Sequence, residues 1–162
     1  RENRAFLKEH NTDYLDEESL RMHPVLGISA ANVAPEFGVA ETKSLIRISY
    51  LTPSGDKFRH ELEEKVFSET RWQKWLPENL KAVEPRAIRT NPALAYKVVT
   101  SCGHYYLDEP DVLTAKKSFF RVLKKKKINP EREVIESIKK AMVKYVDAFN
   151  LKDLNKVILC GV

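Results

Sequence analysis

The stretch that most constrains the fold runs from Leu45 to Leu107, because its residue order predicts a strand, a helix and two further strands in succession. Residues 45–51 form a β-branched and aromatic run, which stops at Thr52-Pro53-Ser54-Gly55, a signal for a turn and a helix cap. Apolar residues at helical spacing follow, from Phe58 to Leu76. Residues 93–100 then alternate in side-chain character, turn through 101–104 and return as 105–107. The predicted order is β-α-β-β, a sheet with a helix on one face.

Two amphipathic helices are expected after this unit. The first begins at Pro110 and places Val112, Ala115, Phe119 and Leu123 on one face. The second is capped by Asn129, has Pro130 at its first position, and carries a wide apolar stripe (Val134, Ile135, Ile138, Ala141, Met142, Tyr145, Val146 and Phe149). This stripe needs a surface to pack on, and both the chain's own sheet and a partner helix fit that need.

The two ends of the chain are expected to differ from the core. Before residue 43, only a short helix from about Asp16 to Met22 is predicted, and the rest has a composition that favours an extended arm held by something outside the domain. We therefore divide the chain into an arm (1–42), a core domain (43–128) and a C-terminal helix with its tail (129–162). In the tail, Val157, Ile158 and Leu159 predict an added strand or a segment buried against a partner.

Composition narrows the functional classes. The chain has 162 residues, of which 43% are hydrophobic and 31% charged, and its net charge is +5. No apolar run approaches the roughly 20 residues of a membrane-spanning helix, so we expect no membrane insertion. Cys102 and Cys160 lie far apart without a C-x-x-C motif, which predicts neither a disulfide framework nor a zinc site and favours a reducing compartment. The start at Arg1 rather than Met suggests processing or a start that lies before the given sequence.

The strongest functional signal is the basic run at the end of the helix predicted from Pro110. Arg121 and the four residues Lys124, Lys125, Lys126 and Lys127 place five cations within seven residues, with no acid among them. Lysines at a helix end also favour the negative pole of the helix dipole, so a solvated helix end is one interpretation. The other is contact with the phosphates of a nucleic acid, without base specificity. Scattered cations would extend such a surface (Lys43, Arg47, Arg86 and Arg89).

Signals of enzyme chemistry are weak. The sequence has no phosphate-cradling glycine motif. Asp108, Glu109 and Asp111 would suit magnesium in a nuclease, but such acids also favour a helix N-terminus, which is the interpretation we adopt. His104 beside Cys102 is interpreted as part of a structural turn rather than as a nucleophile pair. We therefore predict no catalytic residue, no cofactor and no metal.

Two tryptophans lie three residues apart near the end of the helix predicted after Gly55. Trp72 and Trp75 are interpreted as core or protein-interface residues, with stacking on nucleic-acid bases as the alternative.

The β-α-β-β order followed by a helix resembles the thioredoxin-like fold. Where redox members have C-x-x-C, this chain has Thr52-Pro53-Ser54-Gly55, so the resemblance implies no dithiol exchange. Redox-inactive members of that fold occur in the mitochondrial ribosome and in respiratory complex I, and residues 91–99 (NPALAYKVV) resemble the second strand of that group. Cys102-Gly103-His104-Tyr105-Tyr106-Leu107 and Leu113-Thr114-Ala115 are similar to thioredoxin-like proteins of the large subunit of the mitochondrial ribosome. The likeness covers about residues 45–127.

The resemblance and the basic run together lead us to expect a non-catalytic structural component of the mitochondrial ribosome, located in the matrix. Its expected partners are rRNA and neighbouring ribosomal proteins. A protein-only accessory scaffold of a respiratory complex is the alternative, and a metal-dependent nuclease using Asp108 and Asp111 is a third. RNA binding that weakens steeply with salt would separate the first of these from an apolar scaffold.

Overall fold

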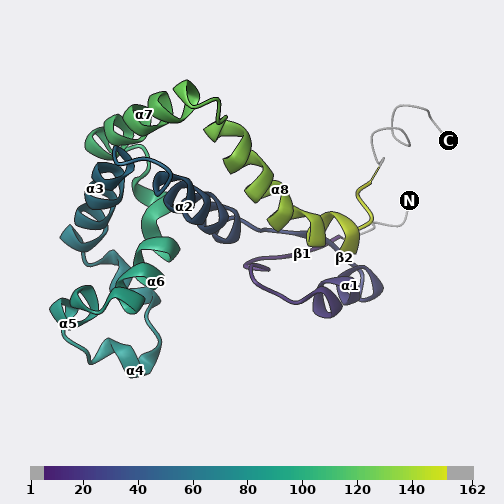
Figure 1. Cartoon of the computed structure of the whole chain (residues 1–162). Helices are drawn as coiled ribbons and strands as arrows, with labels where there is room; N and C mark the ends of the chain where they lie inside the picture. Colours follow the sequence, from purple (N-terminus) through teal and green to yellow (C-terminus); the bar gives the residue numbers. More distant parts are fainter. Residues whose placement is uncertain (1–5, 153–162) are drawn as a thin grey trace. The chain divides into compact units, whose positions relative to one another are not determined.

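The computed structural model describes residues 6–152, and helices dominate them (Figure 1). The elements, in order, are β1 (Leu7–Glu9), α1 (Glu17–Val25), β2 (Ile28–Ala31), α2 (Pro35–Ser49), α3 (Gly55–Ser68), η1 (Arg71–Trp75), α4 (Glu78–Lys81), α5 (Pro85–Thr90), α6 (Pro92–Cys102), η2 (Gly103–Tyr106), α7 (Pro110–Lys125) and α8 (Pro130–Ala148). The described residues contain one sheet, of the two parallel strands β1 and β2. The chain thus mixes helix and strand, with helix far more abundant.

The three strands predicted between residues 45 and 107 are wrong. Residues 45–49 form the last turns of α2, residues 93–100 belong to α6, and residues 105–107 lie in and just after the 3₁₀ helix η2. The Asn91 side chain accepts hydrogen bonds from the amides of Ala93 and Leu94, which caps a helix rather than opening a strand. The β-α-β-β sheet of a thioredoxin-like core is therefore not formed by these residues.

Three longer helices are confirmed, at α3, α7 and α8, but α3 ends at Ser68, short of the predicted end near Leu76, and the tryptophans lie in the separate 3₁₀ helix η1. The predicted cap of α8 is present, since Asn129 Oδ1 accepts from the Arg132 amide at 3.0 Å. The short N-terminal helix is also found: Asp16 Oδ1 accepts from the Ser19 amide at 2.7 Å. It continues beyond the predicted end at Met22 and includes Pro24.

The chain divides into two compact units. Among the described residues, one unit, here called the terminal unit, combines residues 6–37 with 138–152; the other, the helical unit, comprises residues 38–137. In the terminal unit, β1 pairs with β2, and the Tyr145 hydroxyl of α8 lies 3.2 Å from the Thr12 carbonyl oxygen. The segment expected to be an extended arm held from outside thus folds against part of its own chain's last helix. Residues 35–42 of that segment begin α2 rather than continuing extended.

The core of the helical unit lies between α3 and α7, which pack side by side (Figure 1). The rings of Phe58 and Phe119 have centroids 5.0 Å apart, and both side chains are fully buried. Gly55 sits at the corner where the chain turns from α2 into α3. A Cβ atom there would lie 1.9 Å from the Ser49 carbonyl oxygen, so this corner accepts only glycine.

Candidate nucleic-acid interface

The lysine run, Lys124 to Lys127, forms the end of α7 and the turn that follows it. The Ile128 amide donates to the Leu123 carbonyl and the Lys127 amide to the Lys124 carbonyl, both at 3.0 Å. This pair of bonds is a Schellman motif, in which the residue after the helix cap adopts a left-handed conformation. Lys127 is that residue, with φ of 61°. Glycine is preferred at this position, so the chain carries a lysine where the backbone disfavours one by roughly 1 kcal/mol.

Two of the four lysines already have partners within the helical unit. Lys124 forms an ion pair with Glu131 in the first turn of α8, and the Lys126 ammonium donates to the Leu51 carbonyl oxygen at 3.0 Å. Partial burial raises the pKa of the Glu131 carboxyl, but the hydrogen bond from Lys124 outweighs that effect, and the pKa lies below its usual value. The side chains of Lys125 and Lys127 are exposed and make no ion pair with a described residue. Of the four lysines, these two have ammonium groups that a ligand in solvent can reach.

The other predicted basic residues fall into two groups. Lys43 and Arg47 lie one turn apart on α2, and Arg47 forms an ion pair of 3.0 Å with Glu133, close in the chain to the partner of Lys124. Arg121 is exposed on α7, one turn before the run. Arg86 and Arg89 lie on α5, elsewhere in the helical unit (Figure 1). The structure therefore places Arg121 next to the run and joins Arg47 to the first turn of α8, whereas Arg86 and Arg89 lie apart on α5 and Lys43 has no described contact with the run.

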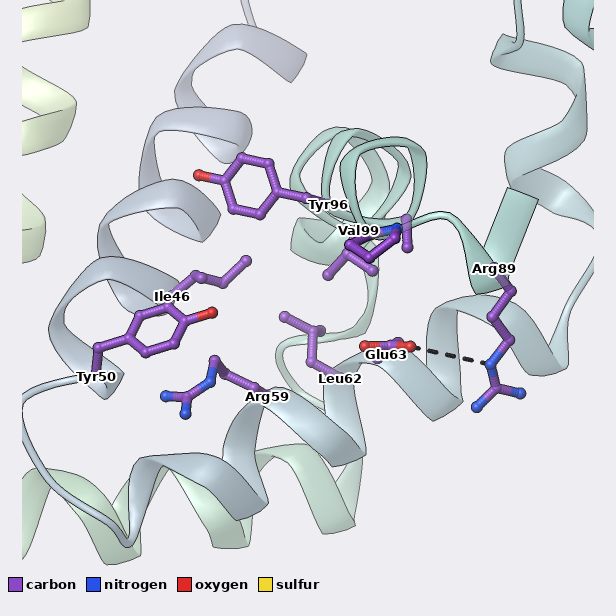
Figure 2. A pocket seen from close by; sticks show the side chains of 10 residues that line it. Ile46, Tyr50, Arg59, Leu62, Glu63, Arg89, Tyr96 and Val99 are labelled. Carbon is purple, nitrogen blue, oxygen red and sulfur yellow. Dashed lines mark ion pairs between the residues drawn. The ribbon is translucent and has the colours of Figure 1, made fainter. Parts of the chain in front are cut away.

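A pocket of about 330 Å³ opens beside the α2–α3 corner, lined from α2, α3, α5 and α6 (Figure 2). We call it the tyrosine pocket, because Tyr50 and Tyr96 project into it and are 66% and 49% exposed. Figure 2 shows the two tyrosines reaching in from different segments, with Ile46 between them and Leu62 and Val99 to their right. The remaining lining residues are Arg59, Glu63, Arg89, Pro92 and Ala95.

Polar groups at the rim of the tyrosine pocket are held in place. The Arg59 guanidinium lies 3.7 Å from the centroid of the Tyr50 ring, donates to Ser49 Oγ at 2.8 Å and pairs with Asp56. The Arg89 guanidinium pairs with Glu64, and its Nε lies 3.9 Å from Glu63 Oε1. Glu63 thus keeps a carboxylate with spare acceptor capacity at the pocket wall.

Sequence reasoning missed this pocket because it interpreted residues 45–51 and 93–100 as strands. If residues 45–51 formed a strand, Ile46 and Tyr50 would lie on the same face of it, but the predicted sheet gives no reason to expect Tyr96 close to that face. On helices, Ile46 and Tyr50 are four residues apart, and Tyr96 and Val99 are three apart, so each pair lies on one side of its helix. The helix-start signal Asn91-Pro92 would have revealed the second of these pairs.

The predicted tryptophans differ in environment. Trp72 is 2% exposed, and its ring meets that of Phe67 edge-on at a centroid distance of 5.2 Å. Trp75 is 59% exposed, with the Lys74 ammonium 5.0 Å from its ring centroid. Trp72 belongs to the core, and Trp75 is the one placed to meet a partner. The predicted interface residues Val157, Ile158 and Leu159 lie outside the described residues.

The acidic residues considered for magnesium are placed at the start of α7. The Glu109 carboxylate lies 3.2 Å from the Lys65 ammonium, and Asp111 is in the first turn. Within residues 6–152, no three His, Cys, Asp or Glu side chains gather closely enough to hold a metal ion. Cys102 is buried, and burial raises the pKa of its thiol. His104 is partly buried, and burial lowers the pKa of its imidazole.

Comparisons with known proteins gave no match: no family model, no curated protein and no solved structure resembles the chain significantly. Across the described part of the chain, no helix combines the length and apolar character needed to cross a membrane.

Proposed function

We propose that this chain is a non-catalytic structural component of a ribonucleoprotein, and that its helical unit contacts RNA phosphates through the lysine run. The observation that carries the proposal is Lys127. A lysine in a left-handed turn is less stable than glycine, so its charge at this position is explained by a partner that uses it. Lys125 and Arg121 add exposed cations on the same helix end. Such a surface binds a polyanion without reading its sequence.

We further propose that the particle is the large subunit of the mitochondrial ribosome, in the matrix. This part is supported by the short sequence strings around residues 91–99 and 102–115, and the fold gives it no added support, because the expected strands are helices. Sedimentation of the native protein from a mitochondrial lysate, with and without RNase, tests it. Migration with the large subunit that is lost after RNase supports the proposal, whereas migration with a membrane complex that is insensitive to RNase contradicts it.

The phosphate contact is tested with variants that separate charge from stability. Lys127→Gly removes the ammonium and relaxes the turn, so it should raise the thermal midpoint while weakening binding to short single-stranded RNA. Each lost phosphate contact should reduce the slope of log K against log salt by about 0.7. Lys127→Arg, the matched control, keeps the charge and should keep the slope. Unchanged affinity and slope in a Lys125→Gln/Lys127→Gly double variant would refute the phosphate contact.

A protein-only scaffold remains the second candidate, and one observation favours it. In the terminal unit, Met22, Val25 and Leu26 at the end of α1 are exposed apolar residues close together in the chain. Exposed apolar patches mark protein interaction sites. The affinity for a partner bound at these apolar residues should not fall as the salt concentration rises, whereas the affinity for RNA at the lysine run should fall.

A further inference from the structure

The tyrosine pocket has the features of a site for one flat, uncharged ring. Its volume of about 330 Å³ is at the small end of the range for ligand pockets, which suits one ring system rather than a chain. Its floor is aliphatic, from Ile46, Leu62 and Val99. Two tyrosine rings stand at its mouth and remain about half exposed or more, and the Arg59 guanidinium lies over one face of the Tyr50 ring. Aromatic side chains in this position are stacking partners for any base.

The two arginines that line the pocket, Arg59 and Arg89, already pair with acidic side chains, Arg59 with Asp56 and Arg89 with Glu63 and Glu64. Glu63 would repel an anion, while its carboxylate oxygen can accept a hydrogen bond from an amino group. Acidic side chains accept from the exocyclic amino group of cytosine in nucleic-acid recognition. Arg59 cannot draw a phosphate inward freely, because Asp56, Ser49 and the Tyr50 ring already engage its guanidinium. The occupant that fits is a base that carries an amino group.

The lysine run contacts the residue that follows one wall of the pocket. The Lys126 ammonium is bonded to the carbonyl of Leu51, and Leu51 directly follows the pocket residue Tyr50. A nucleic-acid strand whose phosphates lie on Lys125 and Lys127 would thus pass the mouth of the pocket. Only a single strand can place an unstacked base there, because bases in a duplex are stacked and paired.

We propose that the tyrosine pocket binds one unstacked, amino-bearing base of a single-stranded RNA segment whose phosphates lie on the lysine run. This inference rests on the proposed RNA binding, and it adds a base preference to it. Oligocytidine should therefore bind more tightly than oligouridine of equal length, because the two pyrimidines differ in carrying an amino group or a carbonyl oxygen at the same ring position.

The experiment measures fluorescence anisotropy with oligocytidine and oligouridine of about ten nucleotides, at two salt concentrations. Tyr96→Ala should weaken oligocytidine binding by about tenfold, the usual size of a lost stacking contact. Its salt slope should be unchanged, since no phosphate contact is lost. Tyr96→Phe should restore the affinity, and Glu63→Ala should abolish the preference for oligocytidine. Because Tyr96 is half exposed, the variants should keep the wild-type melting temperature.

The outcomes separate the two proposals. If Tyr96→Ala and Tyr50→Ala bind as the wild type does while Lys127→Gly binds less well, the pocket proposal is wrong and the phosphate contact stands. Equal binding of oligocytidine and oligouridine by the wild type also overturns the base preference. If the wild type binds neither oligonucleotide at low salt, the proposed function fails and the pocket proposal fails with it.

Discussion

Lys144 Nζ lies 2.8 Å from Glu36 Oε1, joining α8 to the first turn of α2 across more than a hundred residues of chain. The Tyr145 hydroxyl donates to the same carboxylate, and the Tyr14 amide donates to it at 2.7 Å. Both side chains of the ion pair are mostly buried, with 21% and 15% exposed. This cluster ties the N-terminal segment to α8 within the terminal unit.

Glu36→Ala should lower the free energy of unfolding of the terminal unit by about 2–3 kcal/mol, because it removes the carboxylate that pairs with the mostly buried Lys144 ammonium and leaves that charge with only the Leu15 carbonyl oxygen as acceptor. Chemical denaturation followed by circular dichroism measures the change. Lys140→Ala, an exposed position on the same helix, should change stability by less than about 0.5 kcal/mol. Equal effects of the two variants would contradict a stabilising role for the cluster.

The same carboxylate should make the terminal unit sensitive to acid. Burial raises the pKa of Glu36, but hydrogen bonds from Lys144, Tyr145 and the Tyr14 amide outweigh it, so the pKa lies below its usual value of 4.5. The unfolded chain therefore binds a proton at higher pH than the folded chain does. The stabilisation is present above pH 4.5 and is lost as pH falls through the folded-state pKa. Stability measured against pH should drop less over this window in Glu36→Gln than in the wild type, and parallel curves would refute the assignment.

Gly55→Ala should destabilise the helical unit by roughly 3 kcal/mol or more, since the new methyl group would overlap the Ser49 carbonyl oxygen and the backbone has to move. It should also weaken RNA binding, because the corner that it opens holds both Tyr50 and Leu51. Thermal unfolding and anisotropy measure the two effects. Ser101→Ala, an exposed site on α6, is the control and should leave both unchanged. A Gly55→Ala protein as stable as the wild type would show that the corner is not as tight as described.

Cys102 should be unreactive in the folded protein. Its side chain is buried, and burial raises the pKa of the thiol above its usual value of 9.0, which suppresses the thiolate that reacts. In a Cys160→Ser variant, a colorimetric thiol reagent at pH 8 should label Cys102 at the rate of unfolding, and rapidly in denaturant. Fast labelling under native conditions would contradict the described burial.

RNA binding should depend on salt less steeply than the number of cations suggests. Five cations lie between residues 121 and 127, yet Lys124 and Lys126 have partners, so we expect about three phosphate contacts and a slope near −2 rather than about −3.5. Glu131→Gln releases Lys124 from its ion pair, so it should raise the affinity and steepen the slope. Anisotropy titrations across salt concentrations measure both. A wild-type slope near −3.5 would mean that the paired lysines bind phosphate as well.

The sequence predicts helices correctly where a helix-start signal is followed by apolar residues at helical spacing. Pro110 and Pro130 mark helix starts, and α7 buries one face, whereas α8 buries Val134 and Tyr145 but leaves Ile135 and Met142 of its predicted stripe exposed. It fails at α2, whose end buries Leu45, Ile46 and Ile48 on adjoining faces, so that no 3.6-residue period separates it from a strand. At α6, the β-branched residues Val98 and Val99 outweighed the cap signal of Asn91-Pro92.

The candidate site follows the same division. The lysine run is local in sequence and visible in it, whereas the tyrosine pocket depends on tertiary contacts between α2, α3, α5 and α6. Which lysines are free also depends on tertiary structure, because Glu131 and the Leu51 carbonyl come from other elements. No pattern of neighbouring residues encodes these pairings.

At position 127, selection for a stable turn and selection for a positive charge favour different residues. In a library randomised at this position, selection for heat resistance should enrich glycine and asparagine, which adopt the conformation readily. Selection for RNA binding in the same library should enrich lysine and arginine.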